Sequence, residues 1–183
     1  MTHYIDIELK PTKELRENIL LNQVYTAFHK RLYDLNSNNI GVSFPQYYLR
    51  LGKLFRIHAI KDVLEIFILE DWLGEYTKYC KISKILVVPQ NVQHRNISRI
   101  QQNMSEAKLR RVIKRGNISQ EEIKQYRIKM FQGGLDNPYV ELKSMSNGQL
   151  HRRFIKFGDL QENEIKGTFD LFGLSRNSTI PCF

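Results

Sequence analysis

The stretch LFRIHAIKDVLEIFILEDW, Leu54–Trp72, decides the fold because one regular pattern gives way to another within it. Its first part, residues 54–59, alternates in the manner of a strand that is buried on one side. From Lys61 to about Trp72 the apolar residues recur at helical spacing, which predicts an amphipathic helix. The sequence therefore predicts a strand that leads almost directly into a helix.

The flanking chain adds further predicted elements of the same kinds. Upstream, residues 3–9 alternate like a strand, residues 11–35 have helical periodicity, and residues 40–44 (IGVSF) predict a short strand. Downstream, residues 82–88 (ISKILVV) predict another strand. The order strand, helix, strand, strand, helix, strand is typical of the ferredoxin-like fold, a four-stranded antiparallel sheet with both helices on one face. We therefore expect an α+β chain whose residues 1–90 form an N-terminal ferredoxin-like domain.

A smaller C-terminal α+β domain is expected over residues 91–183, where the composition becomes more basic. Residues 1–90 hold 12 Lys/Arg and 10 Asp/Glu, whereas residues 91–183 hold 16 and 9, so +7 of the net charge of +9 lies in the second part. Two helices are predicted there: a basic, arginine-rich one over about 105–115, and one over 121–130 that begins with the capping box Ser119 and Glu122. They are followed by strands over 139–145 and 150–157, joined near Asn147-Gly148, and by a last strand over 168–174.

The segment Asn91–Gly116 concentrates positive charge, with Glu106 as its one acid against Arg95, Arg99, Lys108, Arg110, Arg111, Lys114 and Arg115. Four of these cations fall on neighbouring turns of one side of the predicted helix, namely Lys108, Arg111, Lys114 and Arg115. Like charges held so close repel one another, so the arrangement favours contact with a polyanion such as a nucleic acid. An ordinary solvated face remains the alternative.

Several classes of function lack their sequence signals here. No apolar run reaches the roughly 18 residues of a membrane span, and the first residues lack the apolar block of a signal peptide, so we expect no membrane partner and a cytoplasmic location. Cys80 and Cys182 lack the spacing of a disulfide framework or a zinc site. Asp6 and Glu8 fit a solvated strand face better than a metal pair, and no other cluster has metal spacing. We expect neither a metal nor another cofactor.

Two places remain candidates for chemistry. His29, in the first predicted helix, lies about 130° from the centre of the apolar stripe, which makes it either a surface histidine or part of a site. The segment KSMSNGQ, Lys143–Gln149, puts the hydroxyls of Ser144 and Ser146 beside a glycine turn, with arginines behind it. Hydroxyls, backbone amides and arginines suit a phosphate or a ribose, whereas a polar hairpin tip is the alternative.

A series of motifs makes the chain resemble a known family. In order they are GVSFP at 41–45, IHA at 57–59, VVP at 87–89, SRIQ at 98–101, the basic helix, LKSMSNGQ at 142–149 and FGLS at 172–175. The same motifs occur in the same order in the type I-F CRISPR repeat-processing endoribonucleases, and the resemblance covers essentially the whole chain. It implies an N-terminal ferredoxin-like domain and a C-terminal domain with an arginine-rich helix, in agreement with the periodicity.

The resemblance also implies an activity. Members of this family bind the hairpin of the CRISPR repeat RNA and cleave at the 3′ base of its stem by attack of a 2′-hydroxyl, without a metal. Their products carry a 5′-hydroxyl and a 2′,3′-cyclic phosphate or a 3′-phosphate. The enzyme stays bound to the mature crRNA, so the expected partners are the repeat hairpin and other subunits of the type I-F surveillance complex.

Roles for individual residues follow from the same resemblance. His29 matches the family's catalytic histidine and would be the general base, and Ser144 matches the serine that holds the reacting ribose hydroxyl. Phe172 stands where members can carry a tyrosine, and His151 aligns with an aromatic residue that stacks on the terminal base pair. The roles of His29 and Ser144 are both filled by protein side chains, so the resemblance implies no cofactor.

For RNA binding, Arg99 and Gln101 match the pair that reads base edges near the foot of the stem, where arginine suits guanine and glutamine suits adenine. Arg111, Lys114 and Arg115 match the residues that enter the groove of the hairpin. With the patterns described above, the expected RNA-binding residues are Arg99, Gln101, Lys108, Arg111, Lys114, Arg115, Ser146, Gln149, His151, Arg152 and Phe172.

Two other functions stay open at this point. The chain could be a non-catalytic subunit that binds the RNA hairpin, with His29 merely exposed. It could also bind DNA through a helix-turn-helix over residues 105–130. The second helix of that motif would begin with Glu121 and Glu122, which disfavours DNA because it puts acids against phosphates.

Overall fold

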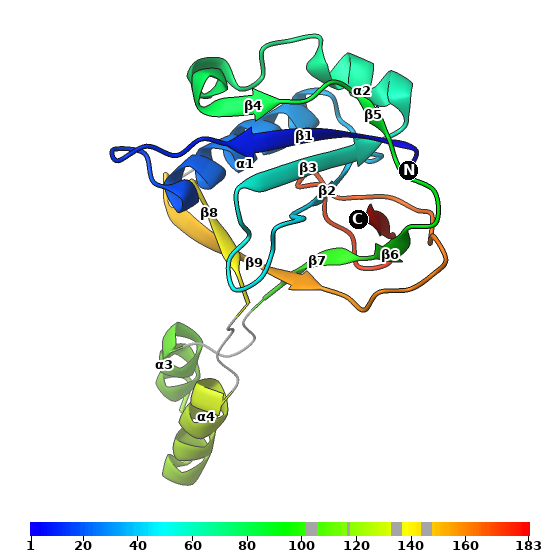
Figure 1. The fold of residues 1–183 in the computed structure, drawn as a ribbon. Helices are drawn as coiled ribbons and strands as arrows, with labels where there is room; N and C mark the ends of the chain where they lie inside the picture. Colours follow the sequence, from blue (N-terminus) through cyan, green and yellow to red (C-terminus); the bar gives the residue numbers. More distant parts are fainter. Residues whose placement is uncertain (102–105, 117, 133–136, 144–147) are drawn as a thin grey trace.

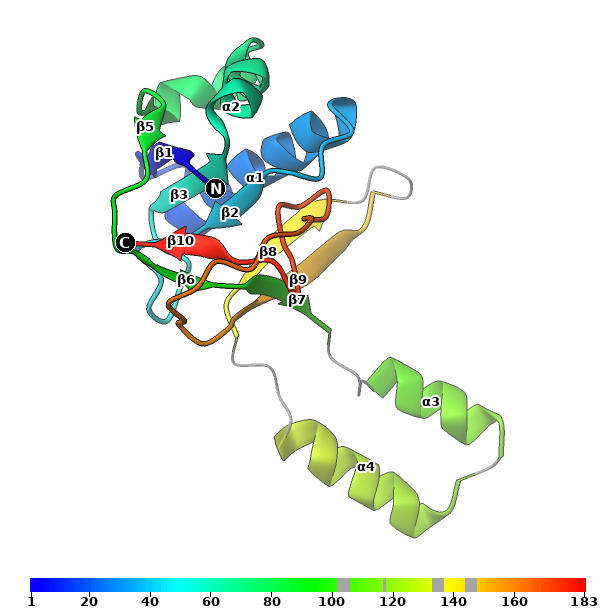
Figure 2. The ribbon, with the colours of Figure 1, turned by 90° about the vertical axis from the view of Figure 1, so that its right-hand side faces the viewer.

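The computed structural model describes residues 1–101, 106–116, 118–132, 137–143 and 148–183, without the side chains of residues 131 and 132. Figures 1 and 2 show the sheets gathered in one body, with helices α3 (Glu106–Lys114) and α4 (Gln120–Gln132) side by side outside it. Of the helices in the described ranges, none combines the length and the apolar character that crossing a membrane requires.

The first part of the chain has the predicted ferredoxin-like topology. Its elements are β1 (His3–Leu9), α1 (Glu17–Asp34), β2 (Gly41–Ser43), β3 (Leu54–Ala59), α2 (Lys61–Ile68), β4 (Cys80–Ile82) and β5 (Leu86–Val87). The sheet runs in the order β2-β3-β1-β4, and each of these pairings is antiparallel; β5 continues beside β1. The sequence prediction of this arrangement is confirmed.

The helices of this part are shorter than the periodicity predicts, and side chains bond to the backbone in the residues that flank them. Before α1, the hydroxyl of Thr12 accepts the N–H of Leu15 at 3.0 Å, which makes a turn of residues expected to be helical. After α2, Asp71 accepts the N–H of Gly74 at 3.1 Å, and a short 3-10 helix, η1 (Gly74–Tyr79), follows. Short polar side chains compete with helices in this way.

The strand expected over residues 82–88 is broken into β4 and β5 by Ser83. Its hydroxyl accepts the N–H of Asp6 at 2.9 Å and donates to the carbonyl of Lys84 at 2.7 Å. The side chain thus replaces a backbone partner in the ladder beside β1. An edge interrupted in this way offers a shorter row of free backbone groups to other chains.

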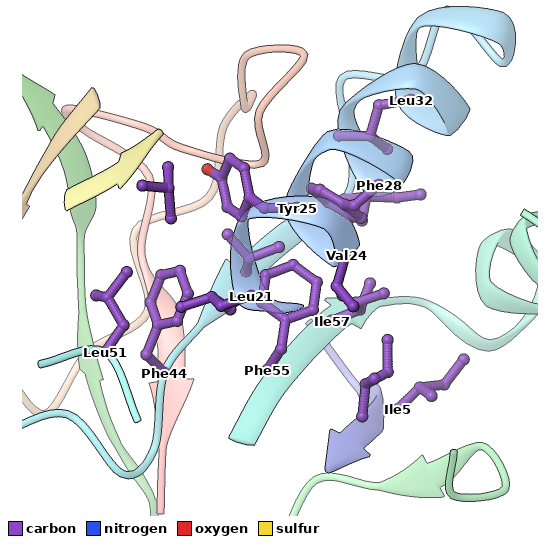
Figure 3. Close-up of a cluster of buried hydrophobic side chains, with 14 of the residues drawn as sticks. Ile5, Leu21, Val24, Tyr25, Phe28, Leu32, Phe44, Leu51, Phe55 and Ile57 are labelled. Carbon is purple, nitrogen blue, oxygen red and sulfur yellow. The ribbon is translucent and has the colours of Figure 1, made fainter. Parts of the chain in front are cut away.

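The main core lies between this sheet and the helices. Ile5 and Ile7 on the predicted apolar face of β1 are buried, as are Val24 and Phe28 of α1. Figure 3 shows Ile5, Val24 and Phe28 between α1 and the sheet, and the rings of Phe28 and Phe55 lie 5.3 Å apart at an interplanar angle of 77°. Edge-to-face aromatic packing of this kind fixes how α1 sits on the sheet.

The second part adds two small sheets and the helix pair. Its strands are β6 (Gln93–Arg95), β7 (Ile97–Ile100), β8 (Tyr139–Lys143), β9 (Leu150–Phe157) and β10 (Ile180–Cys182), in the orders β7-β9-β8 and β10-β6. Apolar residues of these sheets, such as Val140 and Ile155, belong to the same buried cluster as Phe28. The core therefore runs through both parts of the chain, and a domain boundary near residue 90 stays a prediction.

Several expectations for this part need correction. The strand predicted over 168–174 is wrong: residues 170–174 form a tight turn, described below, and the last strand is β10. Strands β6 and β7 lie in the basic segment, where charged side chains conceal their alternation.

The capping box is confirmed, because Glu122 accepts the N–H of Ser119 at 2.7 Å and Ser119 accepts the N–H of Glu122 at 3.2 Å. Asn147 of the expected hairpin turn lies outside the described residues.

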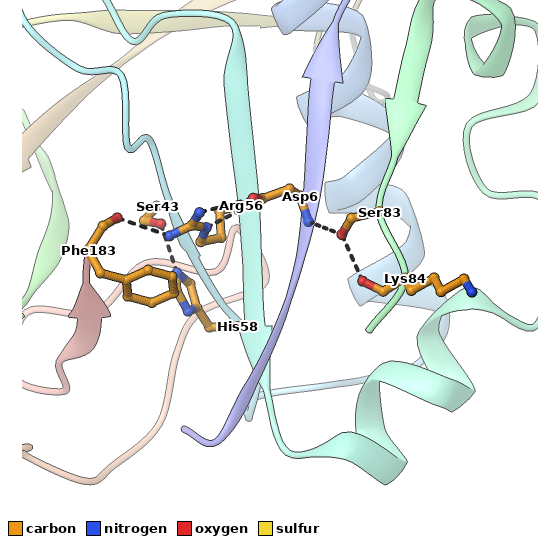
Figure 4. A network of polar contacts seen from close by, with 7 residues as sticks. All are labelled: Asp6, Ser43, Arg56, His58, Ser83, Lys84 and Phe183. Carbon is orange, nitrogen blue, oxygen red and sulfur yellow. Dashed lines mark hydrogen bonds and ion pairs between the residues drawn. The ribbon is translucent and has the colours of Figure 1, made fainter. Parts of the chain in front are cut away.

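The opposite face of the first sheet carries a buried polar network (Figure 4). Arg56 on β3 pairs with Asp6 on β1 at 2.6 Å and donates to the carbonyl of Phe183 at 3.1 Å. Beside it, the Nε2 atom of His58 lies 2.7 Å from the hydroxyl of Ser43. His58 is fully buried, and burial followed by the charge of Arg56 lowers its pKa well below the ordinary value of 6.5. This histidine is a neutral structural residue, and Asp6 serves an ion pair within the fold.

Candidate active site

The candidate site is built on the turn of residues 170–174. Asp170 shapes it, because its Oδ1 accepts the N–H groups of Phe172 at 2.9 Å and of Leu174 at 3.0 Å. Gly173 has φ +69°, and a Cβ there would come within 3.0 Å of Val42. Only glycine fits such a position without strain. The turn is thus held against β2 and presents residues 171 and 172 to helix α1.

Tyr25 of α1 fixes the backbone of this turn through a hydrogen bond. Its hydroxyl donates to the carbonyl of Phe172 at 2.8 Å. The ring is fully buried, and burial followed by the charge of Asp170 raises the pKa of Tyr25, so the hydroxyl remains a donor at neutral pH. Because Tyr25 lies one helical turn before His29, the same bond sets the turn relative to His29.

His29 faces the turn and is half-buried. Its Nδ1 atom lies 2.6 Å from the carbonyl oxygen of Leu171. A carbonyl oxygen can only accept, so Nδ1 carries the proton, and the neutral ring has its lone pair on Nε2. A histidine held in this tautomer can take a proton at Nε2. The sequence left open whether His29 is a surface residue; it lies against the 170–174 turn.

Phe172 lies between His29 and Arg153. The rings of His29 and Phe172 stack at 3.7 Å between centroids with 13° between their planes. The guanidinium carbon of Arg153 lies 3.3 Å from the centre of the same Phe172 ring. Two planar groups this close to one centroid cannot share a face, so they cover opposite faces of Phe172. The result is a three-layer stack of imidazole, phenyl ring and guanidinium.

The strand register places Arg99 on the same side as Arg153. Arg99 on β7 lies opposite Ile155 on β9, and Arg153 lies two residues from Ile155. Directly opposed residues and residues two apart share one face of a sheet. His151 is two further residues along and lies opposite Leu142, on the same face again. This face therefore brings Arg99, His151 and Arg153 to the side of the sheet that packs on α1.

Arg152 lies on the other face of the sheet. It is opposite Glu141 in the register and pairs with that carboxylate at 2.9 Å, while its guanidinium carbon lies 4.7 Å from the centre of the Tyr139 ring. Of the two neighbouring arginines, Arg153 lies against the Phe172 ring that stacks on His29, and Arg152 is turned away. Arg152 is among the RNA-binding residues expected from the sequence, whereas Arg153 is not.

The basic helix forms a second cluster of candidate residues. Its predicted RNA-binding cations, Lys108, Arg111, Lys114 and Arg115, are exposed. Leu109 of α3 and Ile123 of α4 are buried, so the two helices pack through apolar residues and leave the cations outside. An ion pair of 3.6 Å between Glu106 and Arg127 links the same helices. Exposed cations held on one helix can bind successive phosphates of a nucleic-acid backbone.

Other predicted residues occupy different places. Gln101 and Gln149 are exposed, at the end of β7 and just before β9. Ser144 and Ser146 lie outside the described residues. Among the residues that the structure describes, no group of three or more His, Cys, Asp or Glu could hold a metal ion.

Known proteins match this chain over almost all of its length. The family model described as "CRISPR-associated protein (Cas_Csy4)" matches residues 4–183. Two relatives carry the name CRISPR-associated endonuclease Cas6/Csy4. That of Pseudomonas aeruginosa (strain UCBPP-PA14) is 34% identical over 187 residues, and that of Escherichia coli (strain UTI89 / UPEC) is 32% identical over 184 residues. Each alignment covers 100% of this chain and of the relative.

A solved structure of the CRISPR endoribonuclease Cse3 bound to a 19 nt RNA is also similar, with a TM-score of 0.40 and 10% identity over 100% of both chains. The family assignment rests on the sequence matches, which reach from the first strand to the last. The chain belongs to the Cas_Csy4 family of CRISPR-associated proteins.

Proposed function

We propose that the protein is a metal-independent endoribonuclease that binds the hairpin of CRISPR repeat RNA and cleaves it at the 3′ base of the stem. The single observation that carries this proposal is the contact of His29 with the turn. Because Nδ1 donates to the carbonyl of Leu171 at 2.6 Å, Nε2 is left as a base. Relatives at 34% and 32% identity are named as CRISPR-associated endonucleases, which supports the same activity.

The proposed reaction uses a nucleophile that RNA itself supplies. Nε2 of His29 takes the proton of the 2′-hydroxyl, and the O2′–P bond forms as the bond from phosphorus to the 5′-oxygen breaks. The departing 5′-oxygen takes up one proton, from the imidazolium or from water, and the products are a 2′,3′-cyclic phosphate and a 5′-hydroxyl. Intramolecular attack of this kind needs orientation and a base rather than a metal-bound water.

Two groups of residues are proposed to hold the RNA. The cations of α3 contact phosphates of the hairpin, while Arg99 and Gln101 read base edges near the foot of the stem. Ser144 is proposed to fix the reacting ribose. Cleavage then takes place where the stem meets the single strand, beside the turn of residues 170–174. We further propose that the enzyme keeps its product and joins other subunits of a surveillance complex.

A paired binding and cleavage assay tests this function. A repeat hairpin is incubated in excess EDTA with the wild type, with His29→Ala and with His3→Ala as a matched histidine control from β1. We expect the wild type and His3→Ala to bind and cut, and His29→Ala to bind without cutting. Binding without cutting by the wild type would instead make the protein a non-catalytic RNA-binding subunit, and equal competition by duplex DNA would favour the helix-turn-helix alternative.

A further inference from the structure

Arg153 carries a positive charge that has no carboxylate partner within the described part of the chain. It is half-buried on β9 and makes no ion pair with the residues that the structure describes. Its buried Nε atom has no hydrogen-bond partner in the same residues. Its neighbour Arg152, by contrast, pairs with Glu141 at 2.9 Å. A half-buried cation whose buried Nε lacks a hydrogen bond is costly, so Arg153 is a candidate for binding an anion.

A second arginine adds to this unbalanced charge. Arg99 lies on the same face of the sheet, and burial followed by its positive charge lowers the pKa of Arg153. The charge of Asp170 acts in the opposite direction on the pKa of Arg153, but its Oδ1 already accepts two N–H groups of the turn. Two guanidinium groups that repel each other on one face of the sheet form a site that attracts a phosphate.

The separation of Arg153 from His29 fits one phosphodiester. The Phe172 ring centre lies 3.7 Å from the imidazole centroid and 3.3 Å from the guanidinium carbon, on opposite faces, so these two groups are about 7 Å apart. A nucleotide whose 2′-hydroxyl donates to Nε2 of His29, and whose adjacent phosphate accepts an N–H of Arg153, likewise spans roughly 7 Å between the two side chains. A 2′-hydroxyl and its adjoining phosphate beside the Phe172 ring can therefore reach His29 and Arg153 together.

We propose that Arg153 binds the scissile phosphate of the RNA beside His29 and stabilises the negative charge that grows on its nonbridging oxygens during attack. This inference rests on the proposed endoribonuclease function. Arg99 lies on the same side and holds the RNA at the adjoining base. Arg153 forms no covalent bond and transfers no proton; it supplies a fixed charge where the transition state gains one.

The alternative role is a purely structural one, in which Arg153 only supports the Phe172 ring. The two roles differ in what they require of the RNA. A phosphate contact needs the negative charge of that phosphate, whereas support of Phe172 does not. Replacing the scissile phosphate by a neutral methylphosphonate removes the charge, and a 2′-deoxy sugar at the attacking position prevents cleavage. Binding can then be measured with each RNA.

The experiment compares wild type, Arg153→Gln, Arg153→Lys and the control Lys156→Gln, which removes one positive charge from the other face of β9. On the charged, uncleavable hairpin we expect Arg153→Gln to weaken binding about tenfold, because a hydrogen bond between charged groups is lost. On the methylphosphonate hairpin we expect wild type and Arg153→Gln to bind alike. An equal loss on both RNAs, or no loss on either, overturns the inference.

Cleavage of the ordinary hairpin separates this inference from the proposed function. We expect Arg153→Gln to cut about 100-fold more slowly than wild type, and Arg153→Lys to recover part of the rate because it keeps the charge. If wild type cuts with dependence on His29 while Arg153→Gln cuts at the wild-type rate, only the role of Arg153 is wrong. If wild type does not cut at all, the proposed function fails. Should Arg153→Gln fail to fold, the same RNA comparison with Arg153→Lys decides.

Discussion

The imidazole of His29 lies flat against the ring of Phe172, with 3.7 Å between centroids and 13° between planes, while its Nδ1 atom meets the carbonyl of Leu171 at 2.6 Å. Both contacts come from consecutive residues of one turn, so the turn fixes the tilt of the ring and its tautomer together. Helix α1 supplies the imidazole, and a segment more than 140 residues away in the chain orients it.

Replacing Phe172 tests the importance of the stack. Phe172→Leu keeps the bulk but loses the flat surface, so we expect a fall of roughly 10- to 100-fold in the single-turnover cleavage rate, since a small misplacement of the base is costly. Phe172→Tyr keeps the stack and should cut at nearly the wild-type rate. Rates are measured at saturating enzyme on the repeat hairpin. A wild-type rate for Phe172→Leu would show that stacking does not position His29.

Replacing Asp170 tests the turn itself. Asp170→Ala removes the acceptor of two backbone N–H groups, and we expect a loss of roughly 1 kcal/mol in the free energy of unfolding and slower cleavage. Asp170→Asn retains an oxygen at the same place and serves as the matched control. Urea unfolding and single-turnover cleavage follow the two effects. Equal behaviour of the two variants would mean that the charge of Asp170, rather than its hydrogen bonds, matters.

The basic helix should contact phosphates on one side. Arg111 and Arg115 lie close together around α3, whereas Arg110 points about 100° or more away from both. We expect Arg111→Gln and Arg115→Gln each to reduce the slope of log Kd against log salt concentration by about 1, and Arg110→Gln to reduce it less. Filter binding at a series of salt concentrations provides the slopes. Equal changes for all three variants would indicate a diffuse charge effect.

His58 should make stability depend on pH. Its pKa is lowered in the folded state, mainly by burial, so the unfolded chain binds a proton that the folded chain does not. The contribution of neutral His58 to the free energy of unfolding is therefore complete above about pH 6.5 and falls as the pH drops below that value. Urea unfolding between pH 5 and 8 measures this slope, which His58→Gln should flatten. An unchanged slope in that variant would assign the effect to other groups.

The elements that could be predicted from the sequence are those set by local pattern. The alternation in β1, β3 and β9 reflects the two-residue period of one strand, and the capping box at Ser119 and Glu122 needs only four residues. Such features require no knowledge of the rest of the chain. The fold class followed because these local elements come in a recognisable order.

The turn of residues 170–174 could not be predicted in the same way. Its sequence, DLFGL, alternates enough to resemble a strand, and what makes it a turn is the side chain of Asp170 together with the close approach of Gly173 to Val42. The second contact depends on strand β2, far away in the sequence. A long-range constraint of this kind is absent from a periodicity argument.

The site was predictable in part for a related reason. The helical angle of His29 placed it outside the apolar stripe, which is correct, but its partner Leu171 is set by tertiary structure. Arg152 and Arg153 look equivalent in the sequence, and only the register of β8 and β9 separates them, one toward Glu141 and one toward Phe172. The family resemblance pointed to His29; the geometry added Arg153.

The measurement that tests the central claim most directly is cleavage of two hairpins that differ by a single oxygen. One carries the ordinary ribose before the scissile phosphate and the other a 2′-deoxyribose, and both are incubated with the wild type in excess EDTA. We predict that the first is cut to a 2′,3′-cyclic phosphate end while the second is bound and remains intact. Cutting of the 2′-deoxy hairpin, or loss of cutting when EDTA removes metal ions, would contradict attack by the 2′-hydroxyl with His29 as the base.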